Sequence, residues 1–438
     1  MWVSGRRSAR KDYTIWLLPA DYDAPAPFVE RIYVFDPQGK VASLLEEVAL
    51  RKVELLSSLS ELPAGAKVVV VVGESSGGEE EISSLLERGG VAVFIEPSGE
   101  LPALPGKLRP RRAEGKLGRA WLAGLKHPLV DGLWEEALRD WGGVGREVAR
   151  LYLPREGTPV GRRDLVVAGT ASDPAGLSLL SEFLVGQGKA IVCCLRVVEL
   201  LGEHPPATRL LWDMLRLAQR APLKPARVAE VMGPGGEERD GPYEAGLRVD
   251  WISSPEVLTR KAYDLLIVGS GVDWEALSGW RDRVREFVED GGTALIFLPE
   301  EPIFADGFLP WALRAERAKA EGALKVDPEE PLLWGMTDID LSEAFDGLPC
   351  FVDLAEHYRP LVLASTAQVQ GPFGLLGLRP LPRAGWLVEC RYGAGRYILC
   401  SAPLDAFWER SKGARRVLSA LLANLGVSAK WQEGVRQG

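Results

Sequence analysis

The sequence predicts an α/β fold made of two tandem parallel-sheet domains that arose by internal duplication. Apolar, β-branched runs without polar alternation, such as Val68–Val72, are typical of strands buried on both faces. Helical patterns separate these runs, and a Gly-Gly pair ends two of the helices, as a left-handed helix cap requires. A strand, a helix, a glycine stop and a second strand form a βαβ unit, which places helices on both faces of a parallel sheet.

The third observation is that motifs recur in the same order along the chain, at an offset that drifts from 196 to 207 residues. The matched pairs are Val53–Leu55 with Val249–Trp251, Gly89-Gly90 with Gly291-Gly292, Pro128-Leu129 with Pro331-Leu332, Gly186–Lys189 with Gly393–Arg396, and Ala207–Leu211 with Ala414–Leu418. This recurrence predicts a duplicated unit of roughly 200 residues. We expect an N-terminal extension at residues 1–30, a first repeat at 31–222 and a second repeat at 223–438.

The expected elements follow the chain in the same order in both repeats. The extension holds a short apolar piece, Tyr13–Leu18, which we interpret as an added strand or the remnant of a preceding module. The expected strands are Val68–Val72, Val91–Ile95, Arg227–Met232, Leu265–Val268 and Thr293–Leu298, and the expected helices are Ile82–Arg88 and Trp280–Val288. Late in the second repeat we expect a hairpin of Trp386–Arg391 with Tyr397–Cys400, then a final helix.

Composition restricts the function classes. The net charge of −9 argues against nucleic acid or an anionic membrane as a partner, because acidic surfaces repel both. No apolar stretch reaches the roughly 18–20 residues that span a bilayer, and the first residues lack the apolar core of a signal peptide, so we expect a cytoplasmic protein. The five cysteines form no disulfide or metal-binding pattern, and we expect neither metal nor cofactor. One asparagine and abundant proline favour a thermophilic source.

Several segments, taken in order, resemble the class I glutamine amidotransferase-like fold, a flavodoxin-like α/β domain. They are Tyr263–Val268, Phe287–Ile296 and Tyr392–Ile398. More narrowly, Pro331–Met336 with Asp338 and Asp340 is similar to amidotransferase-like domains of bacterial β-galactosidase-type glycoside hydrolases. The resemblance implies two amidotransferase-like domains and, because such domains help those glycosidases to assemble, a homo-oligomer.

Active members of this family use a cysteine on a tight turn after a central strand, activated by a histidine. The matching strand ends, Phe94–Pro97 and Phe297–Glu300, carry no cysteine. The positions that follow the later strand, Cys193–Arg196 and Cys400–Pro403, carry no histidine. We therefore expect both repeats to be catalytically degenerate, with no catalytic residues of this kind, and an enzyme is the less favoured interpretation.

Candidate ligand-binding residues are polar side chains at expected strand ends and tryptophans near them. They are Glu74, Glu96, Ser270, Asp273, Trp274, Glu300, Glu301 and Trp334. Two carboxylates among them could form a hydrolytic pair, although acidic loop residues are commonplace. Ser270 could help to cradle an anion, or belong to an ordinary β–α turn capped by Asp273. The tryptophans, with Trp280 and Trp311, could stack on sugars or serve as packing residues.

These observations favour a non-catalytic accessory or assembly protein. Its expected link to carbohydrate metabolism would act through self-association or sugar binding, with a carbohydrate ligand or a glycosidase as partner. The alternative is a glycosidase- or amidase-like hydrolase with a non-standard site at the carboxyl ends of the sheet strands, where open α/β folds bind ligands.

Overall fold

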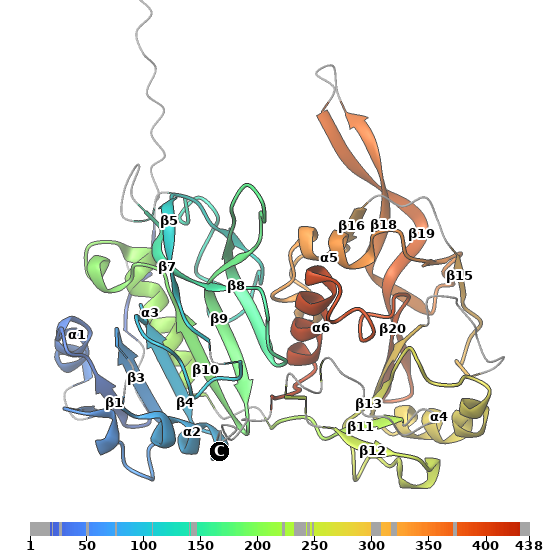
Figure 1. Ribbon diagram of the computed structural model, residues 1–438, viewed down its shortest axis with the longest axis horizontal. Helices are drawn as coiled ribbons and strands as arrows, with labels where there is room; N and C mark the ends of the chain where they lie inside the picture. The colour runs from blue at the N-terminus through green and yellow to red at the C-terminus, as the bar shows by residue number, and fades with distance from the viewer. Residues whose placement is uncertain are drawn as a thin grey trace, which may run out of the picture.

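The chain forms two halves that lie side by side, each built on one large sheet (Figure 1). The computed structural model describes residues 18–19, 21–25, 29–49, 52–74, 77–106, 108–139, 141, 147–220, 224–231, 242, 246–247, 249–298, 308–316, 322–370 and 375–429. The expected strand at residues 13–18 lies almost wholly outside these described residues, and the candidates Glu300 and Glu301 lie outside them as well. Within the described residues, no helix is long and apolar enough to cross a membrane.

Among the residues that the structure describes, the first sheet has ten strands. Their order is β2 (Val53–Leu55), β1 (Ile32–Phe35), β3 (Val68–Val72), β4 (Val91–Ile95), β10 (Gly188–Cys193), β9 (Leu177–Val185), β7 (Ala149–Pro154) and β5 (Arg111–Leu117). β8 (Arg162–Ala168) pairs with β9 and with β6 (Trp121–Leu122).

The described part of the second sheet also has ten strands, in the same order. They are β12 (Asp250–Ile252), β11 (Val228–Val231), β13 (Leu265–Val268), β14 (Thr293–Phe297), β20 (Gly395–Cys400), β19 (Leu375–Tyr392), β17 (Cys350–Val352) and β15 (Arg314–Glu316). β18 (Tyr358–Gln370) pairs with β19 and with β16 (Gly322–Lys325). This strand-by-strand repetition is what an internal duplication produces.

The α/β class is confirmed, but each sheet is mixed rather than parallel. β10 runs parallel to β4 and antiparallel to β9, and β20 has the same relation to β14 and β19. The cause is the Gly-x-Gly turn before β10 and β20, which joins two strands through only two residues and so forces them to be antiparallel. Gly186 and Gly393, at equivalent positions of these turns, both have φ of 59°.

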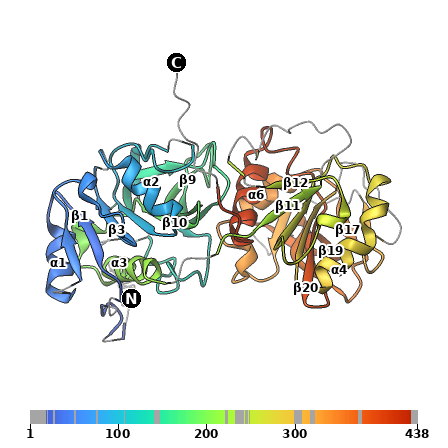
Figure 2. The ribbon, with the colours of Figure 1, turned by 90° about the horizontal axis from the view of Figure 1, so that it is seen from below.

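Helices cover both faces of the parallel part of the first sheet, with α2 on one side and α3 on the other (Figure 2). The helices are α1 (Lys40–Ala49), α2 (Glu79–Glu87), α3 (Pro205–Ala218), α4 (Arg281–Glu289), α5 (Asp338–Phe345) and α6 (Lys412–Asn424). Short 3-10 helices are η1 (Leu59–Glu61), η2 (Val198–Leu200), η3 (Pro255–Val257), η4 (Ala276–Trp280) and η5 (Pro331–Leu333). After α2 and α4, Gly89 and Gly291 adopt φ of 86° and 99°, as the Gly-Gly stops predicted.

Helix α6 lies between the two halves (Figures 1 and 2). Its apolar side chains, including Val417 and Leu421, belong to the core of the second repeat. Its Arg416 and Ser419 instead contact the first repeat, where the Ser419 hydroxyl donates to the carbonyl of Pro159. The last helix of the second repeat therefore also covers part of the first sheet and joins the repeats.

Candidate functional site

At the carboxyl edge of the first sheet, Glu96 is held in place while Glu74 is exposed. Glu96 follows β4 with φ of 49°, a left-handed conformation that costs a non-glycine residue about 1 kcal/mol or more. Its Oε1 accepts the backbone N–H of Val198 at 2.7 Å. Burial raises the pKa of the Glu96 carboxyl, and the nearby Glu199 adds to the rise. Glu96 thus supports the start of η2.

At the matching edge of the second sheet, Ser270 and Trp274 are buried and Asp273 is exposed. The backbone N–H of Ser270 donates to Oδ2 of Asp405 at 2.8 Å, so a carboxylate already occupies the position where an anion would bind. Oδ1 of Asp273 accepts the N–H of Glu275 at 2.9 Å, just before η4. These contacts belong to an ordinary β–α turn.

The candidate tryptophans are not gathered into one exposed platform. Trp274 and Trp280 are 6% and 8% exposed and pack in the same core. Trp334 lies where the repeats meet: its Nε1 donates to the carbonyl of Leu125 at 2.8 Å, and its ring packs edge-on against His127 at 4.7 Å. Trp334 therefore attaches the second repeat to the first.

The cysteines and histidines are separate. All five cysteines are buried and free of disulfides, and burial raises the pKa of both Cys194 and Cys400 to about 12. Each histidine is engaged elsewhere: His127 with Glu182, His204 against the ring of Trp141, and His357 stacked on Trp311. The described residues therefore hold no thiolate–imidazole pair of the amidotransferase kind.

A buried ionic cluster surrounds Glu182 on β9. Its carboxylate faces Arg163 Nε at 3.2 Å, His127 Nε2 at 3.3 Å and Lys189 Nζ at 3.7 Å. Burial alone would raise the pKa of Glu182, but Arg163 and His127 hold it well below its usual value. Burial lowers the pKa of His127, whose Nδ1 accepts the N–H of Leu129 at 3.3 Å, so the proton of the neutral ring is on Nε2, facing Glu182.

The second repeat contains the counterpart of this cluster around Glu389 on β19. Arg359 Nε donates to Glu389 Oε2 at 2.9 Å, and Arg396 Nη1 donates to its Oε1 at 3.1 Å. Glu330 Oε2 accepts from Arg359 at 2.8 Å, and Glu330 Oε1 accepts the N–H of Leu332 at 3.2 Å.

Four positions of the two clusters correspond. The matched pairs are Glu182 with Glu389, Arg163 with Arg359, Lys189 with Arg396, and His127 with Glu330. His127 and Glu330 each accept the N–H two residues ahead in a Pro-Leu turn, although one is an imidazole and the other a carboxylate. A position that tolerates either group while keeping this contact has a structural role, so we assign His127 to packing and capping.

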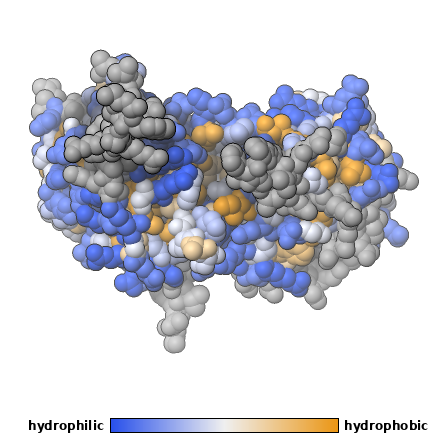
Figure 3. Space-filling view, turned by 90° about the horizontal axis from the view of Figure 1, so that it is seen from above, coloured by the Kyte–Doolittle hydropathy of each residue, from blue (hydrophilic) through white to orange (hydrophobic). Residues whose placement is uncertain are grey.

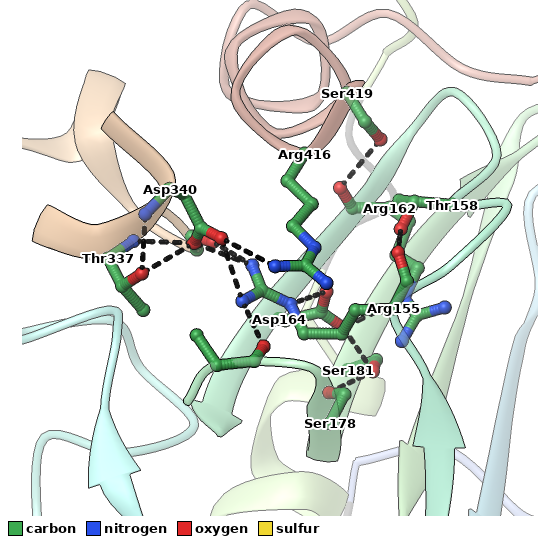
Figure 4. A network of polar contacts seen from close by, with 12 residues as sticks. Arg155, Thr158, Arg162, Asp164, Ser178, Ser181, Thr337, Asp340, Arg416 and Ser419 are labelled. Carbon is green, nitrogen blue, oxygen red and sulfur yellow. Dashed lines mark hydrogen bonds and ion pairs between the residues drawn. The ribbon is translucent and has the colours of Figure 1, made fainter. Parts of the chain in front are cut away.

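A second buried network joins the repeats (Figure 4). Three arginines alternate with three aspartates, so the formal charges balance. The ion pairs are Arg162–Asp164, Arg155–Asp164, Arg155–Asp340, Arg416–Asp340 and Arg416–Asp173. Arg155, Arg162 and Asp164 come from the first repeat and Asp340 and Arg416 from the second. Separating the elements that carry these charges would leave buried charges unpaired, which is costly.

Residues of both repeats line a groove of about 510 Å³. Its first-repeat wall includes Trp121, Leu122, Leu125, Val167 and Ala175, and its second-repeat wall includes Leu324, Pro328, Met336 and Ile339. The polar lining is sparse: Glu135, Lys325, Thr337 and Asp338. Viewed from above, apolar surface appears near the middle of the molecule, between the halves (Figure 3).

Lys325, the last residue of β16, is the only basic side chain among the described residues that line the groove. Its ammonium donates to the backbone carbonyl of Met336, which lines the groove as well. Burial lowers the pKa of Lys325, and the carboxylates of Asp338 and Asp340 act in the opposite direction. None of the groove residues was among the sequence-derived candidates, because its walls come from segments about 200 residues apart that share no motif.

Comparisons with known proteins give only distant similarities. No family model and no curated protein matches the chain. Similar solved structures include a cytoplasmic protein from Salmonella typhimurium (16% identity, 45% of this chain and 96% of that chain, TM-score 0.27). They also include a putative ThuA-like protein from Bacteroides uniformis (10%, 45% and 91%, TM-score 0.26) and a β-galactosidase from Bacillus circulans (13%, 82% and 54%, TM-score 0.26). We draw no function from similarities with TM-scores this low.

Proposed function

We propose that this protein is a non-catalytic binding protein whose ligand lies in the groove between two degenerate repeats. One observation carries the proposal: the groove has the size, the mostly apolar lining and the few polar groups of a small-molecule site, and both repeats contribute to it. A site between the repeats also explains why the chain has two of them, because a single repeat supplies only one of the two walls.

The polar groups at the sheet edges support a non-catalytic role. The Glu96 carboxylate is engaged by the N–H of Val198, and the N–H of Ser270 by Asp405. These contacts stabilise the turns that carry Glu96 and Ser270. The thiols of Cys193 and Cys400, which end the two equivalent strands, are fully buried.

Sugar binding and self-association stay predictions, and we give sugar binding less weight than the binding of an apolar ligand. Trp121 is the one tryptophan among the described residues that line the groove, and Arg119 already lies over its ring at 5.3 Å. A sugar could stack only on the remaining face, so we favour an apolar ligand over a carbohydrate.

The test is a thermal-shift screen against sugars, amino acids, nucleotides and small apolar compounds, with two matched variants. Ile339 lines the groove and Val257 is an exposed apolar residue outside it. A ligand at 100 times its dissociation constant adds about 2.7 kcal/mol of stability. We expect I339E to abolish the shift, because it places a charge in the apolar groove, and V257E to keep it. A shift that survives I339E, or no shift for any compound, would contradict the proposal.

One observation favours a second function, hydrolysis at the carboxyl edge of the first sheet. Glu96 combines a left-handed backbone with a raised carboxyl pKa, and each of these features is found more often at functional sites than elsewhere. Turnover of nitrophenyl esters, nitrophenyl glycosides or glutamyl anilides would support it if E96Q removed the activity and E74Q, at an exposed strand end, did not.

A further inference from the structure

We infer that the groove captures neutral carbonyl compounds, with the amine of Lys325 forming an imine with an aldehyde or ketone that has an apolar body. This inference rests on the proposed function, because it assigns chemistry to the same groove.

The first support is the position of the amine. Lys325 belongs to the second-repeat wall of the groove, whose apolar residues include Leu324, Met336 and Ile339. Among the described residues, its ammonium donates a hydrogen bond to a neutral backbone carbonyl and forms no ion pair with a carboxylate. Lys189 is different: it is buried too, but Glu182 lies 3.7 Å from its Nζ and it does not line the groove.

The second support is the ionisation of the amine. Only a neutral amine attacks a carbonyl carbon, and a lysine in water is almost entirely protonated at neutral pH. Burial lowers the pKa of Lys325 and so raises the neutral fraction. The same desolvation that makes the groove apolar therefore makes its amine a better nucleophile.

The reaction needs no further reagent. The nitrogen of Lys325 forms a bond to the carbonyl carbon, and a proton moves from nitrogen to the carbonyl oxygen to give a carbinolamine. Loss of that oxygen as water leaves a carbon–nitrogen double bond. The sum is amine plus carbonyl compound giving imine plus water, with no change of oxidation state.

The other polar groups of the groove restrict the ligand. Asp338 and Glu135 line it as carboxylates, so an anionic ligand would meet like charge on entry. The remaining lining is largely apolar, which favours an aliphatic or aromatic body over a polyol. A neutral, apolar aldehyde or ketone meets both conditions.

The experiment uses octanal with cyanoborohydride and, in parallel, 1-octanol, which has a similar shape but cannot condense. Hydride reduction fixes the imine as a secondary amine. We expect the intact protein to gain the mass of octanal less one oxygen, and peptide mapping to place this label on Lys325. The label should be lost in K325R, which keeps a cationic donor for the Met336 carbonyl but cannot form an imine. Lys126, with a side chain 59% exposed, reports the background of surface labelling.

The outcomes separate the two proposals. If octanol stabilises the protein and octanal leaves no label on Lys325, the groove binds ligands and the imine inference is wrong. Label distributed over exposed lysines such as Lys126, with no excess on Lys325, also overturns the inference. If neither compound binds or labels, the imine inference is wrong, and the proposed function fails as well only if the wider thermal-shift screen also gives no shift. Near-ultraviolet circular dichroism of K325R confirms that the variant is folded.

Discussion

Arg155 of the first repeat and Asp340 of the second form a bidentate ion pair from which solvent is excluded. Nη2 of Arg155 lies 2.9 Å from Oδ2 of Asp340, Nη1 lies 3.2 Å from Oδ1, and the two side chains are 1% and 0% exposed. Removing two charges from water is costly, and only their mutual attraction and further hydrogen bonds offset that cost. The repeats therefore depend on each other, since separating them would leave both charges unpaired.

The first prediction tests this dependence with D340N. Asparagine keeps an acceptor for the N–H of Thr337 but removes the charge that pairs with Arg155 and Arg416. We expect a loss of about 3–5 kcal/mol in the free energy of unfolding, as for other broken buried pairs. Urea denaturation, followed by circular dichroism and tryptophan fluorescence, measures it.

The matched control is E156Q, which removes an exposed ion pair across the same boundary. Lys412 Nζ lies 2.9 Å from Oε1 of Glu156, with side chains 56% and 61% exposed. Such pairs contribute about 0–1 kcal/mol. Equal losses in D340N and E156Q would show that the buried network does not hold the repeats together.

The second prediction compares the two equivalent glutamates. E182Q and E389Q make the same change at the same position of the two sheets, but the partners of Glu182 are 3–5% exposed whereas Arg359 and Arg396 are 48% and 33% exposed. We expect E182Q to cost about 3–5 kcal/mol and E389Q about 1–3 kcal/mol, because water screens the cations left behind in the second repeat. Urea midpoints give the order, and a larger loss in E389Q would contradict it.

The sequence was sufficient to predict the strands of the parallel core, because continuous apolar runs indicate strands that are buried on both faces. Val68–Val72, Val91–Ile95 and Leu265–Val268 are strands with the expected bounds. Helix α2 begins at Glu79, before the expected start, because Glu79–Glu81 carry no apolar periodicity but suit the first turn of a helix. The predicted hairpin of Trp386–Arg391 with Tyr397–Cys400 is confirmed by the antiparallel pairing of β19 with β20. The sequence analysis did not predict that these strands continue the parallel core as one mixed sheet.

The candidate site could not be predicted because it depends on how the repeats pack. Trp121 and Ile339 line one groove but share no motif and lie far apart in the chain. The Glu182–Glu389 correspondence, in contrast, was accessible: it has the offset of 207 residues that relates Gly186 to Gly393. Matching only apolar and glycine motifs overlooks such pairs, since a buried charge is recognised only when its partners are known.

The third prediction concerns Gly335, which lies against the edge of the first sheet. Its φ is 83°, and a Cβ there would come within 3.0 Å of the Cβ of Arg163 and the backbone nitrogen of Asp164. Gly347 has φ of 69° but open space around the same position. We expect G347A to cost about 1 kcal/mol from backbone strain and G335A at least about 2–3 kcal/mol, because the repeats must also move apart. Similar thermal midpoints for the two variants would show that the contact between repeats tolerates displacement.

The last prediction is that stability falls in mild acid because of His204. Burial lowers the pKa of His204 from 6.5 to about 4, and neither ring nitrogen has a hydrogen-bond partner among the described residues. As the pH falls below 6.5, the unfolded chain takes up a proton that the folded protein does not, so folding becomes less favourable until about pH 4.

The H204F variant should lack the loss of stability in acid that comes from the lowered pKa of His204. Phenylalanine can keep the edge-on packing on Trp141, where the ring centroids lie 5.0 Å apart, and it does not titrate. Between about pH 7 and pH 5 we expect the wild-type protein to lose about 1–2 kcal/mol more than H204F, while the two differ little in how their stability changes at higher pH. His127, whose pKa burial also lowers, contributes a loss of the same sign in both proteins. If the urea midpoints of the wild-type protein and of H204F decreased equally as the pH was lowered, His204 would not be the group that loses its proton on folding.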